Sequence, residues 1–198
     1  MKEPTRLTLV TPESPAVSPS LELRSDDELM LLARGGSGAA FDTLVRRHQA
    51  RVLSVAARRL GRPALAADAA QNTFIEVYRT LARYQARGRF RAFLYQILLN
   101  QCRMLERSRR IDERVFETVL DAHPLLPEDE ILAREWRREV EVALGGLSHK
   151  LRDVILLRYS ADLGYAEIAE ALGVPIGTVK RRLFDGLAQL RRRLERRA

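Results

Sequence analysis

Residues 168–183 read IAEALGVPIGTVKRRL, and this stretch decides how the fold of the chain is interpreted. Ala169 and Gly173 are four positions apart. Two helices that cross steeply need a small residue in the first helix and a glycine at the turn, and these two residues meet both needs. Gly173 can take the positive φ angle of a tight turn, and Pro175 suits the start of the next helix. The stretch therefore predicts a helix-turn-helix, an arrangement that usually binds DNA.

Apolar residues in the same stretch can form the small core between its two helices: Ile168, Leu172, Val174, Val179 and Leu183. The outer side of the second helix then carries Thr178, Lys180, Arg181 and Arg182. We expect these four residues to lie in the major groove of DNA, where lysine and arginine bind guanine edges and phosphates. The alternative is a packed helical hairpin whose basic residues are only solvated. Gly164 lies where a serine N-cap would start the first helix better.

The composition of the 198-residue chain narrows the classes of function that it can have. Hydrophobic residues make up 46%, which is enough for a buried core. The formal net charge is +8, and a basic chain of this size has phosphate as its preferred partner. We find no run of 18 apolar residues and no apolar core of a signal peptide, so we expect a cytoplasmic protein without membrane insertion.

Residues that could support catalysis are few and scattered. The single cysteine, Cys102, rules out a disulfide framework or a four-cysteine zinc site within this chain. His48, His123 and His149 lack the spacing of metal ligands, and no pairing of a nucleophile with a base stands out. Basic neighbours can lower the pKa of the Cys102 thiol, but a small semi-buried cysteine is the favoured interpretation. We therefore expect no enzyme activity, no metal and no cofactor.

Proline and charge divide the chain into four segments. Residues 1–24 hold four of the eight prolines and show no helical period, so we expect a disordered tail. Residues 111–130 hold seven acidic residues against one arginine, and we expect a flexible acidic linker there. In residues 25–110 and 131–198, apolar residues recur at steps of three and four and no strong strand pattern appears. The sequence therefore predicts an all-α protein with two small helical domains.

Residues 64–84 predict a helix with two different faces. An apolar stripe, expected to be buried, consists of Ala67, Ala70, Phe74, Val77 and Leu81. A second face carries Asp68, Asn72, Ile75 and Arg79, with Gln71 and Tyr78 beside it. An isoleucine among polar side chains suggests a surface for a protein partner. The alternative is a solvated face with one exposed isoleucine, which is common in soluble proteins.

Residues 87–110 predict the next helix, with a core stripe of Phe90, Leu94 and Ile97. Hydrogen-bonding and cationic side chains follow one another at steps of four and three along another stripe: Gln96, Asn100, Arg103, Arg107 and Arg110. This stripe contains no acidic residue, so we favour a nucleic-acid contact over a merely solvated helix surface.

Taken in order, these motifs resemble one family, the extracytoplasmic-function sigma factors, which are specificity subunits of bacterial RNA polymerase. The resemblance covers about residues 25–195. It rests on the two-domain layout with an acidic linker and on DDELMLLARGGSGAAFDTLVRRHQARV (26–52), AADAAQNTF (66–74), FRAFLYQILLNQCRMLERSRR (90–110) and LRDVILLRYSADLGYAEIAEALGVPIGTVKRRL (151–183). A stand-alone helix-turn-helix regulator would explain residues 147–195 equally well. It would not explain the ordered motifs in residues 65–107.

The resemblance implies roles for particular residues in the first domain. The surface that docks on the clamp helices of the largest polymerase subunit would include Asp68, Gln71, Asn72 and Ile75. A flipped base of the −10 promoter element would be captured by residues 82–90, ARYQARGRF, which contain Tyr84 and Arg87. The adjoining DNA would be contacted by Asn100, Arg103 and Arg107.

In the second domain, the resemblance implies that the −35 element is read by Thr178, Lys180, Arg181 and Arg182. The partners that it implies are core polymerase, including its flap, and promoter DNA. Family members are often held inactive by an anti-sigma protein, so the resemblance also allows such a partner for this chain.

Overall fold

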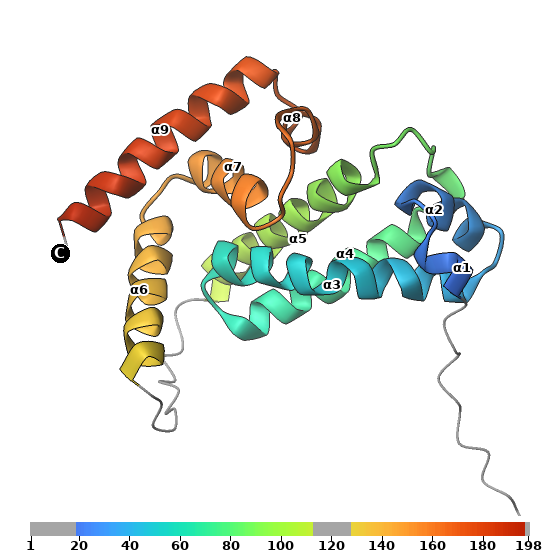
Figure 1. Ribbon diagram of the computed structural model, residues 1–198, viewed down its shortest axis with the longest axis horizontal. Coiled ribbons are helices and arrows are strands. Elements are labelled where there is room, and N and C mark those ends of the chain that lie inside the picture. The colour runs from blue at the N-terminus through green and yellow to red at the C-terminus, as the bar shows by residue number, and fades with distance from the viewer. Residues whose placement is uncertain (1–18, 113–127, 197–198) are drawn as a thin grey trace, which may run out of the picture.

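The computed structural model describes residues 19–112 and 128–196, and every regular element in these two ranges is helical (Figure 1). The prediction of an all-α protein is confirmed. The predicted tail, residues 1–24, and the predicted linker, residues 111–130, lie mostly outside the described residues. Within the tail, α1 (Pro19–Glu22) is a short helix, so helical structure starts before the first predicted domain.

The first module consists of α2 (Asp26–Arg34), α3 (Gly38–Leu60), α4 (Pro63–Arg79), the 3-10 helix η1 (Leu81–Arg83) and α5 (Phe90–Asp112). α2 begins with a capping box, in which Ser25 accepts from the amide of Glu28 and Glu28 accepts from the amide of Ser25. α3 ends where Gly61 adopts a left-handed φ of 67°, and Pro63 starts α4. The three long helices pack around buried apolar side chains that include Leu44, Val52, Leu94 and Leu98.

The second module consists of α6 (Glu128–Gly145), α7 (His149–Tyr159), α8 (Tyr165–Leu172) and α9 (Ile176–Glu195). α8 and α9 form the predicted helix-turn-helix, because Gly173 has a φ of 62° and the amide of Val174 donates to the carbonyl of Ala169 at 2.9 Å. Of the predicted core residues, Ile168, Val179 and Leu183 are buried, and Leu172 and Val174 are partly buried.

The start of α8 shows how the chain manages without a serine N-cap. Gly164 has no side chain, but its own amide donates to the carboxylate of Glu167 at 2.8 Å. This contact is one half of a capping box, and Glu167 supplies it from the first turn of the helix. α8 therefore has one of the two hydrogen bonds of a complete capping box.

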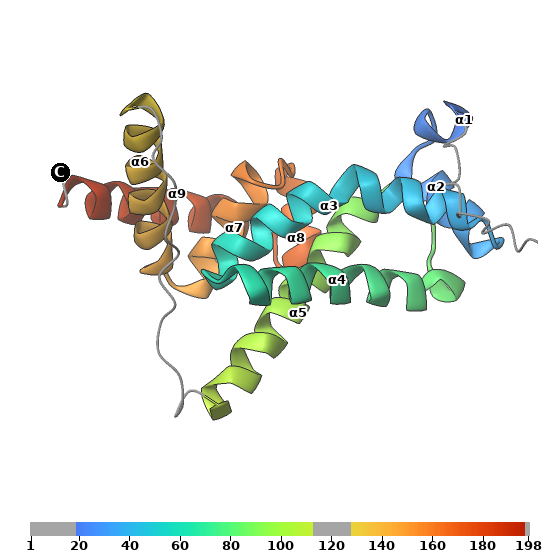
Figure 2. The ribbon, with the colours of Figure 1, turned by 90° about the horizontal axis from the view of Figure 1, so that it is seen from below.

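The two modules pack directly against each other, with α7 and α8 along α3 and α5 (Figure 1, Figure 2). The centre of this contact is Arg59 of α3, whose side chain is 1% exposed. Its guanidinium donates to Asp153 of α7 at 2.5 Å and also to Glu106 of α5. The neighbouring Arg152 donates to the backbone carbonyl of Arg59 at 3.1 Å. We call Arg59, Glu106, Arg152 and Asp153 the interface ion cluster.

A second group of contacts joins the beginning of α5 to the second module. Arg91 donates to the carbonyls of Ala161 and Asp162, at 2.8 and 2.5 Å. Arg89 pairs with Glu170 of α8 at 3.2 Å. α8 is therefore held over the start of α5, while α9 lies on the outer side of the second module (Figure 1).

Candidate nucleic-acid and protein interfaces

α4 turns a different side towards the core from the one that its spacing predicted. The predicted core residues that are exposed or only partly buried are Ala67, Ala70 and Phe74. The residues of α4 that are buried are Ala66, Ala69, Thr73 and Val77. The hydroxyl of Thr73 donates to the carbonyl of Ala69 at 2.6 Å, so this polar side chain is buried without an unpaired group. The prediction was right for Val77 and Leu81, which are buried, and wrong for Ala67, which is exposed. A second stripe, offset by one residue, shares the same helical spacing and supplies most of the buried side.

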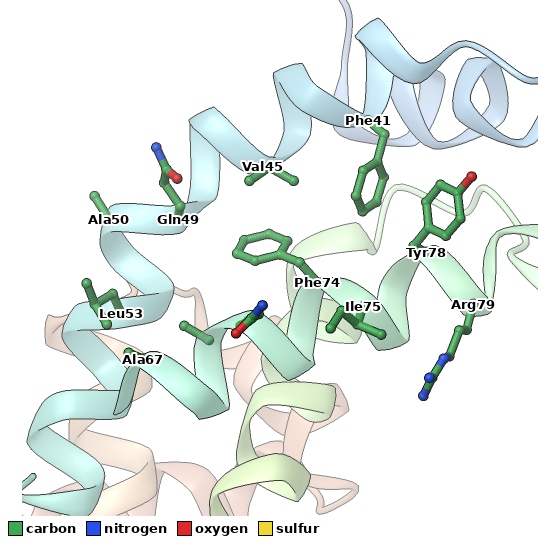
Figure 3. Close-up of a pocket in the computed structure, with 12 residues that line it drawn as sticks. Phe41, Val45, Gln49, Ala50, Leu53, Ala67, Phe74, Ile75, Tyr78 and Arg79 are labelled. Carbon is green, nitrogen blue, oxygen red and sulfur yellow. The ribbon is translucent and has the colours of Figure 1, made fainter. Parts of the chain in front are cut away.

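The apolar residues that α4 keeps out of the core line a groove between α3 and α4 with a volume of about 980 Å³ (Figure 3). Its apolar lining consists of Phe41, Val45, Ala50, Leu53, Ala67, Ala70, Phe74, Ile75 and Tyr78. Figure 3 shows Phe41 and Tyr78 beside each other at one end, where their rings meet edge to face with centroids 5.1 Å apart. Contiguous apolar surface of this kind, rimmed by polar residues such as Gln49 and Arg79, marks an interaction site.

The four residues predicted to bind polymerase are all exposed on α4: Asp68, Gln71, Asn72 and Ile75. Gln71 and Ile75 line the groove. Asn72 and Ile75 also line a second hollow of about 600 Å³ between α4 and α5, which extends to Asn100. Ile75 therefore lies on the ridge between two hollows, and Asp68 lies one turn before Gln71 and Asn72 on the same helix.

The predicted DNA-binding stripe of α5 is exposed along one side of the helix, at Gln96, Asn100, Arg103 and Arg107. The side chain of Arg110 lies outside the described residues. Asn100 accepts a hydrogen bond from Arg103 at 2.9 Å, so the two side chains act as one polar unit. Arg103 also lies 3.7 Å from Asp153 of the second module. Four of the five predicted side chains therefore lie on one exposed side of α5, and Arg103 borders the contact between the modules.

The two candidates in the loop before α5 lie in different environments. Arg87 is exposed, and its guanidinium donates to Gln85. Tyr84 is only 8% exposed, and its hydroxyl donates to Asp27 at 2.8 Å. Burial, together with this bond and the negative charge of Asp27, raises the pKa of Tyr84. Tyr84 therefore has no free ring face at the surface, whereas residues 85–89 are all exposed.

The predicted −35 residues lie at the beginning of α9. Lys180 and Arg181 are exposed, and Thr178 and Arg182 are partly exposed. Lys180 lies over the ring of Tyr165, with 5.9 Å between its ammonium and the ring centroid, a cation–π distance. Val179 and Leu183 on the opposite side anchor the helix in the core, so the basic residues face outward.

In the part of the chain that the structure describes, the histidine, cysteine and acidic side chains do not gather into a metal site. Cys102 is fully buried, and burial raises the pKa of its thiol to about 12, the opposite of the lowering that basic neighbours could cause. Within residues 19–112 and 128–196, no three His, Cys, Asp or Glu side chains are grouped so that they could hold a metal ion. No helix in the described part of the chain is long and apolar enough to cross a membrane.

Two sigma-70 family models match this chain in the same order as the two modules. The model of sigma-70 region 2 matches residues 44–111, and the model of sigma-70 region 4 matches residues 137–190. The region 2 match includes α4 and α5, which a stand-alone helix-turn-helix regulator would not explain. That alternative is therefore not favoured.

Individual relatives extend the match over most of the chain. SigW of Bacillus subtilis, an ECF RNA polymerase sigma factor, is 30% identical over 172 residues, which cover 80% of this chain and 91% of SigW. SigE of Mycolicibacterium smegmatis is 35% identical over 156 residues, covering 77% of this chain and 60% of SigE. Among solved structures, CnrH in complex with the cytosolic domain of CnrY is 29% identical, with a TM-score of 0.69, and the match covers 87% of this chain and 99% of CnrH. The chain belongs to the extracytoplasmic-function group of the sigma-70 family and is an RNA polymerase sigma factor.

Proposed function

We propose that this sigma factor binds core polymerase through α4 and reads the −10 and −35 promoter elements with its first and second modules. Residues 25–110 act as region 2, residues 131–198 act as region 4, and residues 111–130 join them. The observation that carries the proposal is the set of three exposed surfaces on one chain: the apolar groove beside α4, the polar stripe of α5 and the basic side of α9.

The contact with core polymerase is centred on the ridge of α4. The clamp helices of the largest polymerase subunit dock against four exposed residues: Asp68, Gln71, Asn72 and Ile75. A partner helix can place its apolar side chains in the neighbouring groove, which is the usual way in which a groove between two helices binds a third. The polymerase flap contacts the second module. Ile75 is the expected centre of affinity, because it borders both hollows and is not buried within the chain.

The contacts with DNA divide between the two modules. Residues 85–89 receive an extracted base of the −10 element, with Tyr84 supporting them from inside and Arg87 at the surface. Arg103 and Arg107 bind phosphates, and Asn100 lies where it can reach a base edge. The −35 element is bound by Thr178, Lys180, Arg181 and Arg182 in the major groove.

The energetics of promoter opening require a larger partner. Opening ten base-pair steps costs roughly 14 kcal/mol at about 1.4 kcal/mol per step. Stacking one extracted base returns roughly 1–3 kcal/mol. One or two captured bases therefore cannot keep a promoter open, and we expect specific opening only when core polymerase bends and holds the DNA strands.

An anti-sigma protein is a second proposed partner. The match to CnrH, which was solved with the cytosolic domain of CnrY, supports the inference that this chain also has a regulatory protein partner. The groove between α3 and α4 is the surface for which such a protein would compete with core polymerase, since it is lined mainly by apolar side chains and is open to solvent.

Run-off transcription on a genomic library with purified core polymerase tests the proposed function. We expect new transcripts only when this chain is added, and their upstream sequences should share two spaced elements. The free protein should bind such promoters weakly in a gel shift. Equal promoter affinity with and without core polymerase, or no new transcripts, would overturn the proposal.

Promoters found in this way allow the two DNA contacts to be separated. Arg181→Ala removes an exposed cation from α9, and we expect transcription to become less sensitive to base changes in the −35 element. Sensitivity to base changes in the −10 element should alter much less. Equal effects on the two elements would contradict the assignment of α9 to the −35 element.

A further inference from the structure

One carboxylate on α2 holds the loop that precedes α5. Asp27 lies in the first turn of α2, and a single oxygen atom, Oδ1, accepts three hydrogen bonds from this loop. The donors are the hydroxyl of Tyr84 at 2.8 Å and the backbone amides of Arg87 and Gly88 at 2.9 and 3.2 Å. Asp27 is separated from these residues by 57 to 61 positions in the sequence. Its carboxylate therefore links the beginning of the first module to the loop proposed to capture a base.

A second residue of α2 strengthens this attachment. Arg34 lies two turns after Asp27 and donates to the backbone carbonyl of Tyr84 at 3.3 Å. The side chain of Tyr84 packs against Phe93, with ring centroids 5.4 Å apart. The inner end of the loop is thus held by two hydrogen-bonding side chains of α2 and by an aromatic contact with α5.

The outer part of the loop contrasts with this fixed inner end. Residues 85–89 are all exposed, and Gly88 adopts a left-handed φ of 68°, a conformation that side-chain-bearing residues rarely take. Successive amides of a loop in such a conformation need an acceptor, and Asp27 supplies it. When the amides of a loop are fixed by hydrogen bonds to the protein, its exposed side chains keep one arrangement, which lowers the entropic cost of binding.

We propose that Asp27 is a positioning residue for −10 recognition, which holds residues 85–89 in the conformation that receives a base without touching DNA itself. The proposal rests on the DNA-binding role proposed above for this loop. The negative charge of Asp27 suits this role because charge-assisted hydrogen bonds to amides are stronger than neutral ones. Since Asp27 is partly buried and turned towards the loop amides, its charge is directed to them.

Three variants separate positioning from general damage to the fold. Asp27→Ala removes the acceptor, whereas Asp27→Asn keeps an oxygen that can accept from the same three donors. Glu28→Ala serves as the matched control, because it removes the neighbouring capping box of α2 but has no contact with the loop. We first measure hydrogen exchange at the amide of Gly88 by NMR, which needs neither DNA nor polymerase. Exchange should become at least roughly tenfold faster in Asp27→Ala, but not in Glu28→Ala.

The second measurement is transcription with core polymerase on a promoter from the genomic library and on versions with base changes in each element. In Asp27→Ala we expect discrimination at the −10 element to fall roughly tenfold, with discrimination at the −35 element and affinity for core polymerase within about twofold. Asp27→Asn should retain most of the discrimination. Unchanged exchange at Gly88, equal losses at both promoter elements, or the same loss in Glu28→Ala would overturn the proposal.

A further variant distinguishes two outcomes: that Asp27 does not position the loop, and that the loop does not read the −10 element. Gln85→Ala combined with Arg87→Ala removes exposed side chains of the loop without removing Asp27. If this variant keeps full −10 discrimination, the loop does not read the element, and the role of Asp27 in recognition falls with it. If it loses discrimination while Asp27→Ala does not, the loop reads DNA without help from Asp27. Only the proposed positioning role of Asp27 is then overturned.

Discussion

The two sides of the first module differ in what covers them. The side formed by the ends of α3 and α5 is covered by α7 and α8, and the interface ion cluster lies at its centre. The groove between α3 and α4 is lined mainly by apolar side chains and is left open. Charged hydrogen bonds are directional, whereas apolar contact is not. The covered side therefore fixes one orientation of two parts of the same chain, while the open side can accept a separate protein.

Substitution of a residue of the interface ion cluster tests how strongly the covered side stabilises the fold. In Arg59→Met, Asp153, whose side chain is 4% exposed, loses its closest cation. Removing one partner of a buried ion pair costs about 3–5 kcal/mol. We expect the free energy of unfolding, measured by urea denaturation, to fall by this amount. Arg191→Met removes an exposed salt bridge with Glu195 and should change the free energy of unfolding by less than about 0.5 kcal/mol. Equal changes in the two variants would contradict the importance of the covered side.

The buried thiol of Cys102 lies on the same covered side, so its rate of alkylation measures how often this side opens. Burial raises its pKa to about 12, so at pH 8 the thiolate fraction is roughly 1000-fold or more smaller than for a free cysteine. We expect slow alkylation by iodoacetamide in the native protein, faster alkylation as the pH approaches 12, and fast alkylation in urea. The stability that the buried neutral thiol contributes is present below the ordinary thiol pKa and is lost as the pH rises towards the raised one.

The position of Cys102 also connects this measurement with the ion cluster. The charges of Arg59, Glu106, Asp153 and Arg103 all act on the thiol, so it lies next to the contact between the modules. Arg59→Met should therefore accelerate alkylation at pH 8. An unchanged rate in a variant that has lost stability would mean that the loss does not arise from opening beside Cys102.

The features that could be predicted from the sequence are those set by neighbouring residues. The helix-turn-helix depends on Ala169, Gly173 and Val179, which lie within eleven residues, and their spacing was sufficient. In α4, spacing was not sufficient, because burial of Thr73 depends on the bond that it makes to Ala69 and not on its polarity. The apolar groove was missed for this reason. α4 has more apolar positions than one buried face requires, and this excess is the signal in the sequence that indicates an apolar groove.

Contacts between distant parts of the chain left no periodic signal at all. Arg59 and Asp153 are 94 positions apart, and nothing in the sequence around either residue distinguishes it from a charged residue of a solvated helix face. Asp27 is one of three acids in the first turn of α2, where acids are common, and it also accepts three hydrogen bonds from a loop 57 to 61 positions away. Only the three-dimensional arrangement distinguishes these charged residues from their neighbours in the sequence.

A charge on the open side should affect binding and not stability. Ile75→Glu places a carboxylate on the ridge between the two hollows, where the native side chain is 39% exposed. We expect affinity for core polymerase to fall by at least about 2 kcal/mol, or roughly 30-fold. The free energy of unfolding should change by less than about 1 kcal/mol, because the site is partly solvated.

The control for this variant is an exposed apolar residue that lies between α1 and α2, just before the first module. Leu23→Glu alters a side chain that is 90% exposed and lines neither hollow. A fluorescence anisotropy titration with purified core polymerase should show unchanged affinity for this variant. If both variants lose affinity equally, charge itself weakens binding, and the groove has no special role.

α8 contributes Glu167 and Glu170 to the covered side, and the start of this helix can be strengthened without altering either residue. Gly164 has a φ of −72° and a ψ of 162°, which suit a serine N-cap, and an added Cβ would meet only a Glu167 oxygen at an ordinary 3.5 Å. Gly164→Ser supplies the missing half of the capping box, and we expect thermal unfolding to show a few tenths of a kcal/mol of added stability. Gly173→Ser is the opposing control, because its φ of 62° strains any side chain. Destabilisation by Gly164→Ser would mean that Glu167, which also lies 3.5 Å from Arg91, is needed more for the contact between the modules than for the start of α8.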